Sequence, residues 1–364
     1  MTGQPPPSFS EARNRRQKAR AAGLHPDYWY AVEFSRALGR GQVQEVRFWN
    51  RSIALYRDEA GALHAIENRC AHRQLKLSYG HVEGCELVCP YHGWTYDGCG
   101  RVTKIPHELF GHSMPRFELP SYPVRERYGL IWIFPGDPQR AADRGIPDIA
   151  ELEGPGRWAC VPLDFTWKAH YSMIIDNVSD FSHAYLHRQY KPFVDAKLTR
   201  CESVGDSVHL SYSTKVGQGR ISRFFVDRKR VDTNHMDLCF EYPYQWSNTG
   251  DKIKHWCFVL PIDERTTRVF FLFYFEALKI PLLPLRIPRW LMSAVLKIAN
   301  RVLIGPLLSQ DGFAVEAEQE AHEKHWDAPL AELNPAVGMF QQLIIRQWEE
   351  HLSHQHNRTI SIAQ

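Results

Sequence analysis

Four candidate metal ligands stand in two short segments of this chain, CAHR at 70–73 and CPYHGW at 89–94. The pattern is Cys-x-His, then sixteen residues, then Cys-x-x-His, and its ligands are Cys70, His72, Cys89 and His92. Two short loops that each offer one thiolate and one imidazole suit a compact site, and such a site constrains the fold around it. A structural zinc ion is one candidate occupant, although zinc fingers seldom combine these two spacings.

The same pattern resembles the motif of Rieske [2Fe–2S] domains, in which two cysteines bind one iron and two histidines bind the other. The resemblance implies a [2Fe–2S] cluster held by Cys70, His72, Cys89 and His92. Replacing two thiolates by neutral imidazoles removes negative charge, which raises the reduction potential above that of plant-type ferredoxins. Backbone amides of the loops are expected to stabilise the sulfurs, and Trp94 to shield the cluster from water.

Six further cysteines lie outside this motif. Cys85 and Cys99 flank the second loop and suggest a disulfide, but the first loop lacks the extra cysteine that Rieske proteins of respiratory complexes use for such a cross-link. We therefore predict that all six are small buried side chains in a reducing compartment. They are Cys85, Cys99, Cys160, Cys201, Cys239 and Cys257.

A second candidate metal site is the segment DNVSDFSHAYLH at 176–187, which we predict to lie on a helix over 168–188. On a helix His183 and His187 are four residues apart and share one face, with Asp180 one turn earlier. An isolated pair of this kind is more often structural than metal-binding. The whole segment, however, resembles the N-x-x-D-x-x-H motif of Rieske non-haem iron oxygenases. The resemblance implies that His183 and His187 bind Fe(II), and that Asn177 and Asp180 belong to the catalytic machinery.

The segment departs from that family in one respect, because three residues rather than four separate the histidines. If this departure misleads, His170 is the nearest substitute ligand. Iron oxygenases of this type use two histidines and one carboxylate on one face of the metal. Family members carry the carboxylate near the start of a late helix with an acidic residue five positions on, and Asp311 with Glu316 matches. The later acidic residues of 309–325, namely Glu318, Glu320 and Glu323, fit a solvated helix face.

The resemblance also implies partners. In the family a carboxylate bridges the Rieske centre of one subunit and the iron of its neighbour in a ring of three, and Asp180 matches that position. A homotrimer is therefore expected. The segment GRGQVQ at 39–44 lacks the third glycine of a dinucleotide fingerprint, so a separate ferredoxin or flavin reductase is expected to supply electrons, with O2 as co-substrate.

The order of the expected elements, short strands first and then longer strands and helices, predicts an α+β protein with two domains. A basic N-terminal arm spans 1–26, for which a solvated leader is an equal alternative, and a small all-β Rieske domain spans 27–138. The catalytic domain, 139–364, is expected to pack an antiparallel sheet against helices in a helix-grip, START-like fold. A net charge of +3 gives no indication of nucleic-acid binding. No apolar leader precedes a cleavage site, so the expected location is cytoplasmic.

Residues 277–308 are strongly apolar with interspersed basic residues, and no uncharged run is long enough to cross a bilayer. Two interpretations are equally compatible with this segment: a lid or core helix over the active site, and contact with the inner membrane surface. Either suits a hydrophobic substrate. The chain most resembles family branches that act on polycyclic lipids, such as sterol C-4 demethylases. Steroid ring hydroxylases, chlorophyll-catabolite oxygenases and O- or N-demethylases are alternatives within the family. A Rieske electron carrier and a lipid-binding protein without oxygenase activity are alternatives outside it.

Overall fold

The computed structural model describes residues 5–153, 158–190, 193–216, 233–276 and 289–363. The chain divides into two compact units, and each is described by itself. One unit comprises His25–Pro147 and Leu260–Asp263. The other comprises Met1–Leu24, Asp148–Val259 and Glu264–Gln364. The N-terminal segment predicted as an arm thus belongs to the same unit as the second predicted domain.

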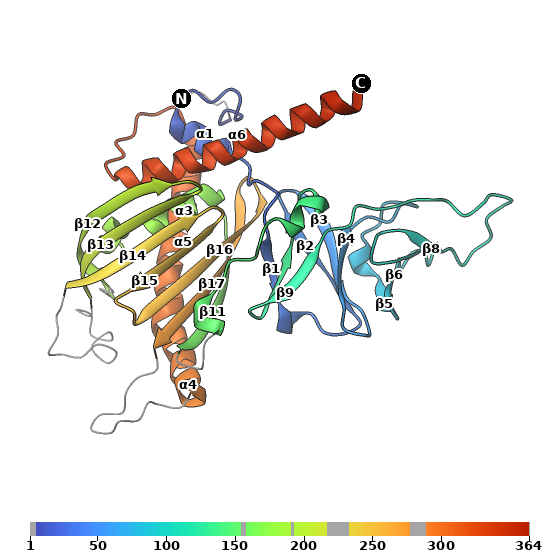
Figure 1. Cartoon of the computed structure of the whole chain (residues 1–364), viewed down its shortest axis with the longest axis horizontal. Helices are drawn as coiled ribbons and strands as arrows, with labels where there is room; N and C mark the ends of the chain where they lie inside the picture. Colours follow the sequence, from blue (N-terminus) through green and yellow to red (C-terminus); the bar gives the residue numbers. More distant parts are fainter. Residues whose placement is uncertain (1–4, 154–157, 191–192, 217–232, 277–288, 364) are drawn as a thin grey trace. The chain divides into compact units, whose positions relative to one another are not determined.

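The smaller unit is built of short antiparallel strands (Figure 1). Three sheets follow in the order β1-β10-β9, β2-β3-β4 and β5-β6-β7-β8. The strands are β1 Tyr30–Phe34, β2 Gln42–Phe48, β3 Arg51–Arg57, β4 Leu63–Glu67, β5 His81–Glu83, β6 Glu86–Val88, β7 Thr95–Tyr96, β8 Val102–Lys104, β9 Val124–Arg127 and β10 Leu130–Ile133. Brief runs of β-branched and aromatic residues explain why the elements here are strands.

The larger unit contains a seven-stranded sheet of order β11-β17-β16-β15-β14-β13-β12. Its strands are β11 Trp158–Trp167, β12 Phe193–Val204, β13 Ser207–Val216, β14 Thr233–Glu241, β15 Tyr244–Thr249, β16 Ile253–Asp263 and β17 Thr266–Glu276. Strands β14 and β15 follow one another directly, and the chain turns between them at Tyr242–Pro243. The predicted α+β class, with a large antiparallel sheet packed against helices, is confirmed.

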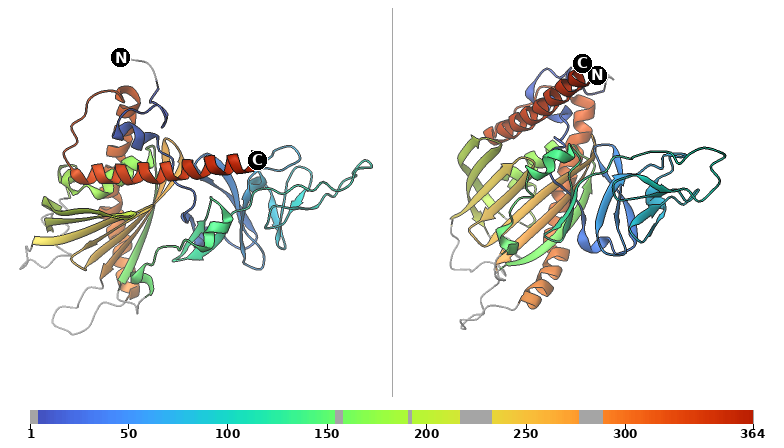
Figure 2. Two further views of the ribbon diagram at one scale, coloured as in Figure 1. Left: turned by 45° about the horizontal axis from the view of Figure 1, so that its top comes forward. Right: turned by 45° about the vertical axis from the view of Figure 1, so that its right-hand side comes forward.

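Helices cover one face of this sheet and cross its end (Figures 1 and 2). They are α1 Arg15–Ala21, α2 Ala150–Glu153, α3 Tyr171–Ser179, α4 Arg289–Ala299, α5 Gly305–His325 and α6 Pro335–Ala363. Helix α3 packs against α5, α6 and β14, and α6 also contacts β12 and β13. Helices α4 and α5 run on from one another through a π-helical stretch, Asn300–Ile304.

The predicted helix over 168–188 is wrong in its second half. Helix α3 ends at Ser179, and a short 3-10 helix, Phe181–Tyr185, follows. Asp180 causes the break, because its backbone is extended and its side chain accepts a hydrogen bond from the Ser182 N–H at 2.8 Å. A carboxylate at such a position favours a helix cap over helix continuation. His183 and His187 therefore do not share one α-helical face.

The N-terminal helix α1 is not a solvated leader. Arg20 lies buried, and its guanidinium donates hydrogen bonds to Ser172 and Asp176 of α3 and to Glu318 of α5, each at 2.8 to 2.9 Å. Glu318, expected on a solvated helix face, is thus half-buried in an ion-pair network. This network fixes α3 and α5 relative to each other.

Candidate metal centres

The first four predicted ligands lie on the loops that follow β4 and β6. Cys70 and Cys89 are each 2% exposed, and the ring centroids of His72 and His92 lie 4.5 Å apart. The His72 ring stacks on the indole of Trp94 at 5.0 Å with 9° between the planes. The expected shielding role of Trp94 has this stacked contact as its structural basis.

Ligand geometry distinguishes a single ion from a two-iron cluster. Ligands of one tetrahedral zinc, at about 2.0 to 2.3 Å from the metal, lie within about 4 Å of one another. Among Cys70, His72, Cys89 and His92, all of them described, no three ligand atoms lie within 4.8 Å of one another. In addition, Nδ1 of His72 is buried and has no hydrogen-bond partner among the described residues. The separation of the ligand atoms fits a [2Fe–2S] cluster better than a zinc ion, and the unpaired Nδ1 fits a metal ligand of either kind.

Backbone amides contribute to this site at Cys89. Burial raises the pKa of the Cys89 thiol, whereas the N–H groups of Tyr91 and His92 donate hydrogen bonds to the sulfur and oppose that effect. Gly93 permits the tight loop, because its φ is +69° and a Cβ there would stand 2.7 Å from the Pro106 ring. The loop that carries Cys89 and His92 is therefore shaped to present amides to sulfur.

Two residues beside this site, His107 and Tyr96, were not predicted from the sequence. His107 accepts a hydrogen bond from the indole N–H of Trp94 at 3.1 Å, and its ring centroid lies 5.9 Å from that of His72. The Tyr96 hydroxyl lies 3.2 Å from the Cys70 sulfur and accepts a hydrogen bond from the Ala71 N–H at 2.9 Å. No sequence pattern marks either residue, because both act from outside the ligand motif.

The Tyr96→Phe variant is expected to lower the reduction potential of a cluster at this site by about 40 mV, the equivalent of roughly 1 kcal/mol for a one-electron couple. Burial raises the pKa of Tyr96, so its hydroxyl stays protonated and donates to sulfur, which stabilises the more negative reduced state. Protein-film voltammetry measures the shift. Tyr56→Phe is the matched control, because the Tyr56 hydroxyl donates to the backbone carbonyl of Cys85 instead. Equal potentials for the two variants would contradict the prediction.

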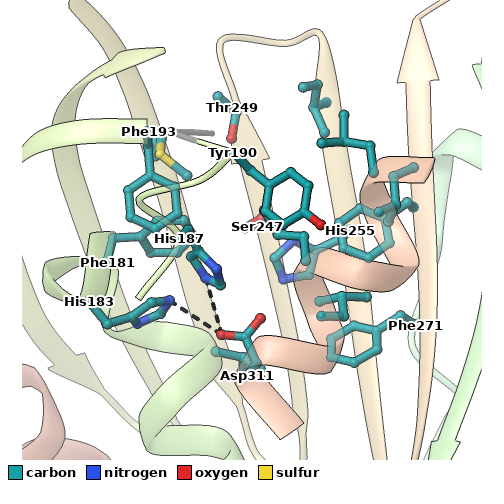
Figure 3. A pocket seen from close by; sticks show the side chains of 18 of the residues that line it. Phe181, His183, His187, Tyr190, Phe193, Ser247, Thr249, His255, Phe271 and Asp311 are labelled. Carbon is teal, nitrogen blue, oxygen red and sulfur yellow. Dashed lines mark hydrogen bonds and ion pairs between the residues drawn. The ribbon is translucent and has the colours of Figure 1, made fainter. Parts of the chain in front are cut away.

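The second centre brings together His183, His187 and Asp311, whose ligand atoms lie within 4.8 Å of one another. His183 comes from the 3-10 helix, His187 from just beyond it, and Asp311 from α5 (Figure 3). Asp311 Oδ1 lies 3.3 Å from His187 Nε2 and 3.5 Å from His183 Nε2. Ligand atoms at about 2.1 Å from one metal and at right angles to one another are about 3 Å apart.

The unpaired polar atoms of this centre also fit a metal ion. Asp311 Oδ1 is buried, and despite its two imidazole neighbours it makes no well-formed hydrogen bond among the described residues. Burial lowers the pKa of His183, and Asp311 only partly opposes it. Burial also lowers the pKa of His187, but the close approach and charge of the Asp311 carboxylate, together with the hydrogen bond to Gln310, outweigh it, so the net shift is upward. One carboxylate oxygen between two imidazoles is the donor set that a divalent metal requires.

Gln310, next to Asp311, was also missed. Its Oε1 lies 2.9 Å from Nδ1 of His187, so Nδ1 carries the proton and Nε2 is left free to face Asp311. Such a partner orients a metal-binding imidazole and fixes its tautomer. The only indication available in the sequence was its position beside the predicted carboxylate.

The other candidate ligands lie elsewhere. His170 is buried at the start of α3, where it bonds to Ser172 and to the carbonyl of Ala22, so it is no substitute ligand. Glu316 accepts a hydrogen bond from the Lys168 N–H. Asn177 lines the cavity beside the centre, and its Oδ1 is buried without a hydrogen-bond partner in the described part of the chain.

The remaining sequence predictions concern Asp180 and the six cysteines outside the first motif. Asp180 Oδ1 accepts hydrogen bonds from the Ser182 N–H and from the Asn334 side chain, both at 2.8 Å. Cys239 and Cys257 are buried as predicted, and Cys160 and Cys201 are only partly buried. The prediction is wrong for Cys85 and Cys99, which are exposed. These two cysteines stand at turns between short strands, where a small unit has too little core to cover them.

A cavity of about 240 Å³ opens beside the second centre. Its wall is overwhelmingly apolar, and Figure 3 shows Phe271 of β17 in it. Other apolar residues of the wall are Phe273 of β17, Leu303 and Ile304 of the π-helical stretch, and Leu307 and Leu308 of α5. A cavity of about 150 Å³ already holds benzene. The site can therefore take a hydrophobic molecule larger than one ring and expose it to the metal ligands.

Comparisons with known proteins agree with both centres. Residues 28–123 match the Rieske [2Fe-2S] domain, and residues 167–355 match the vanillate O-demethylase oxygenase C-terminal domain. The 4beta-methylsterol monooxygenase of Methylococcus capsulatus (strain ATCC 33009 / NCIMB 11132 / Bath) is 46% identical over 339 residues, which cover 93% of this chain and 92% of that protein. The chain is a Rieske non-haem iron oxygenase.

Further relatives support the same assignment for this oxygenase. The oxygenase component of dicamba O-demethylase from Stenotrophomonas maltophilia is 37% identical over 161 residues, 44% of this chain and 45% of that protein. Dicamba monooxygenase bound to 3,6-dichlorosalicylic acid shares the fold, with a TM-score of 0.75 at 21% identity over 91% of this chain and 99% of that chain. The cofactors of the oxygenase are a Rieske [2Fe–2S] cluster and a mononuclear non-haem iron. Other relatives are likewise named as parts of larger systems, such as the iron-sulfur subunit of a toluene-4-sulfonate monooxygenase system from Comamonas testosteroni.

Proposed function

We propose that this oxygenase oxidises a C-4 methyl group of a sterol with O2 and externally supplied electrons. The observation that carries the proposal is the 46% identity to a 4beta-methylsterol monooxygenase across nearly the whole of both chains. The apolar cavity beside the second centre supports it, because a fused-ring hydrocarbon has few polar groups to satisfy.

Each centre has a defined set of residues in this proposal. Cys70, Cys89, His72 and His92 hold the [2Fe–2S] cluster, which passes single electrons. His183, His187 and Asp311 hold Fe(II), which supplies O2 activation when bound. The chain itself contributes the dry apolar wall that orients the substrate and excludes water, and Gln310 contributes the hydrogen bond that aims His187.

A reconstituted assay tests the proposal. The purified oxygenase is incubated with a reductase, NADH, O2 and a 4,4-dimethylsterol, and mass spectrometry is expected to show oxygen added at one C-4 methyl group. The same sterol without C-4 methyl groups is the control and should return unchanged. Absence of any C-4 oxidation by an enzyme that holds both metal centres would overturn the substrate assignment.

Other family branches are the alternative. Relatives with partial matches are named dicamba O-demethylase and chlorophyllide a oxygenase, so a methoxy-aromatic acid and a chlorin are the competing probes. A cationic partner stabilises a carboxylated aromatic substrate, and the described residues that line the cavity include no lysine or arginine. The cavity therefore favours the uncharged lipid over the acid.

We further propose that electrons cross between subunits of a homotrimer through Asp180. Its carboxylate is held by Ser182 and Asn334 at the start of the segment that carries His183, which is a fixed position for a bridge. Native mass spectrometry tests the trimer. A ferredoxin, a flavin reductase or both are the proposed donors, and reduction of the Rieske spectrum by each candidate identifies the donor.

The Asp180→Asn variant is expected to lower turnover about 100-fold while retaining both metal centres, because outer partners of metal ligands contribute 10- to 100-fold. The asparagine oxygen can still accept both hydrogen bonds, so the fold is preserved. Single-turnover kinetics of cluster reoxidation measures the effect. Near-normal reoxidation in this variant would remove the bridging role.

Location is also a proposal: the enzyme is cytoplasmic and contacts the inner membrane surface through α4. Residues 277–288 lie outside the described residues, so the lid interpretation can be assessed only for 289–308. In that part Leu303 and Ile304 line the cavity, whereas Ile298 and Val302 are exposed beside Arg301.

By length and composition, Leu291–His325 is one helix able to cross a membrane. It carries Asp311 of the metal site, so surface contact is the better fit. Co-sedimentation with anionic and with neutral vesicles tests it.

A further inference from the structure

Three polar side chains form a hydrogen-bonded chain in the sheet wall of the apolar cavity. The Ser247 hydroxyl lies 2.7 Å from His255 Nδ1, and His255 Nε2 lies 3.0 Å from Gln245 Oε1. Ser247 and His255 are paired residues of β15 and β16, and both line the cavity, whereas Gln245 is fully buried behind them. Figure 3 shows Ser247 and His255 in the same cavity as His187 and Asp311.

The direction of these hydrogen bonds is fixed from the buried end. Gln245 donates from Nε2 to the carbonyl of Trp246 at 3.4 Å, so its Oε1 faces His255 and accepts. Burial lowers the pKa of His255 to about 4, so the ring is neutral and carries its one proton on Nε2. His255 Nδ1 is then an acceptor, and the Ser247 hydroxyl must donate to it. The lone pairs of the Ser247 oxygen are left to accept from the cavity.

The surroundings make this oxygen distinctive. The His255 ring packs against Phe273 and Phe271, with centroids 5.2 and 6.3 Å apart. Thr249 and Tyr190 also bring hydroxyl groups to the wall, but neither is hydrogen-bonded to an imidazole in the described part of the chain. Polar side chains buried among aromatic rings lower the stability of the fold unless their donors and acceptors have hydrogen-bond partners. The geometry therefore provides, in a largely apolar site, an acceptor whose orientation is fixed by the imidazole and the amide behind it.

We propose that the Ser247 oxygen accepts a hydrogen bond from a hydroxyl group of the substrate, and that Gln245 and His255 hold it in the accepting orientation. This inference rests on the proposed function for the identity of the substrate, and it specifies a 3-hydroxysterol. Carbon 3 adjoins carbon 4, so the anchor for the hydroxyl has to share a cavity with His187 and Asp311, as it does. A 3-ketosterol has no hydroxyl proton to donate to this anchor, the Ser247 oxygen, so we expect a lower kcat/KM for it.

The test compares three probes on the complete enzyme: a 4,4-dimethylsterol with a 3β-hydroxyl, its 3-ketone and its 3-deoxy analogue. We expect kcat/KM for the hydroxyl probe to exceed that of the other two by roughly 10- to 100-fold, the effect of leaving a buried polar group unpaired. Ser247→Ala should reduce this preference to within a few-fold. Thr249→Val, two residues along the same strand, should keep it. An unchanged preference in Ser247→Ala would overturn the inference.

Gln245 provides a second, more specific test, because it lies outside the cavity. In Gln245→Met the imidazole is free to carry its proton on Nδ1, which lets the Ser247 hydroxyl donate to a ketone. The ratio of hydroxyl to ketone turnover should fall, although the cavity keeps its shape. A purely structural role would lower both rates and leave the ratio unchanged, and that result would contradict the inference.

Failure of the substrate assignment can be distinguished from failure of the anchor. If the wild-type enzyme oxidises hydroxyl, ketone and deoxy probes equally, the sterol function stands and the anchor is wrong. If none of the three probes is oxidised, their equilibrium binding shows whether Ser247 accepts a hydrogen bond from the hydroxyl group. Tighter binding of the hydroxyl probe that Ser247→Ala abolishes supports the anchor, and equal binding of all three overturns it.

Discussion

Substituting Asp311 with alanine is expected to lower the iron content from about three atoms per chain to about two and to abolish turnover. The side chain is the carboxylate of the group formed with His183 and His187, and its Oδ1 lies 3.3 and 3.5 Å from their Nε2 atoms. Two imidazoles alone leave a weak site. The Rieske visible spectrum should persist, because its predicted ligands lie in the other compact unit. Metal analysis by inductively coupled plasma mass spectrometry checks the count.

Glu320→Gln is the matched control for this prediction. Glu320 stands on the same helix, nine positions later, and is exposed in a surface ion pair with Lys324. It should retain about three irons per chain and normal turnover. An Asp311→Ala protein that still held the third iron would show that another carboxylate binds it. Glu316 would then be the first residue to test, because it is the other acidic residue that matched the family spacing.

Most of the residues proposed to bind metal could be predicted from the sequence because they belong to short local patterns. Cys70 and His72 are two residues apart, and His183 and His187 are four apart, so chain connectivity alone keeps each pair close. Asp311 is more than a hundred residues away from His187. It was accessible only through the resemblance to a family, since no periodicity indicates which of several acidic residues on a helix faces inward.

The groups that orient these ligands were not predictable in the same way. Gln310, Tyr96 and His107 act through hydrogen bonds whose partners come together only in the folded chain. The break at Asp180 was missed because the helical spacing of the two histidines outweighed the capping preference of an aspartate. The Ser247–His255 pair depends on the register of β15 with β16, which the sequence does not specify.

The burial of α1 was missed for a related reason. A basic segment near a terminus is usually solvated, and composition gave no sign that Arg20 meets two carboxylates from distant helices. Its guanidinium pairs with Asp176 at 2.8 Å and with Glu318 at 2.9 Å. Asp176 also accepts a hydrogen bond from Gln341 of α6 at 3.0 Å. A single arginine thus links four helices, and two of them lead to the metal ligands.

Arg20→Met is expected to lower the free energy of unfolding by about 3–5 kcal/mol, because it leaves the buried carboxylate of Asp176 without its cation. Methionine keeps the apolar stem of the arginine, so loss of packing contributes little. Lys18→Met is the matched control on the same helix. Lys18 pairs with Glu349 at the surface, where such a bridge contributes about 0–1 kcal/mol. Chemical denaturation of both variants measures the difference, and equal losses would contradict a central role for Arg20.

The pH dependence of this variant identifies the cause. Burial raises the pKa of Asp176 from 3.8 to about 6, and Arg20 opposes the rise. A carboxyl group with a raised pKa in the folded state favours folding below its unfolded pKa and loses that contribution as pH rises through the folded value. Without Arg20 the folded pKa rises further, so Arg20→Met should lose more stability at pH 8 than at pH 5. Adding Asp176→Asn removes the buried charge and should restore most of the loss at pH 8. A pH-independent deficit that Asp176→Asn leaves in place would instead assign the effect to the hydrogen bond between Arg20 and Ser172.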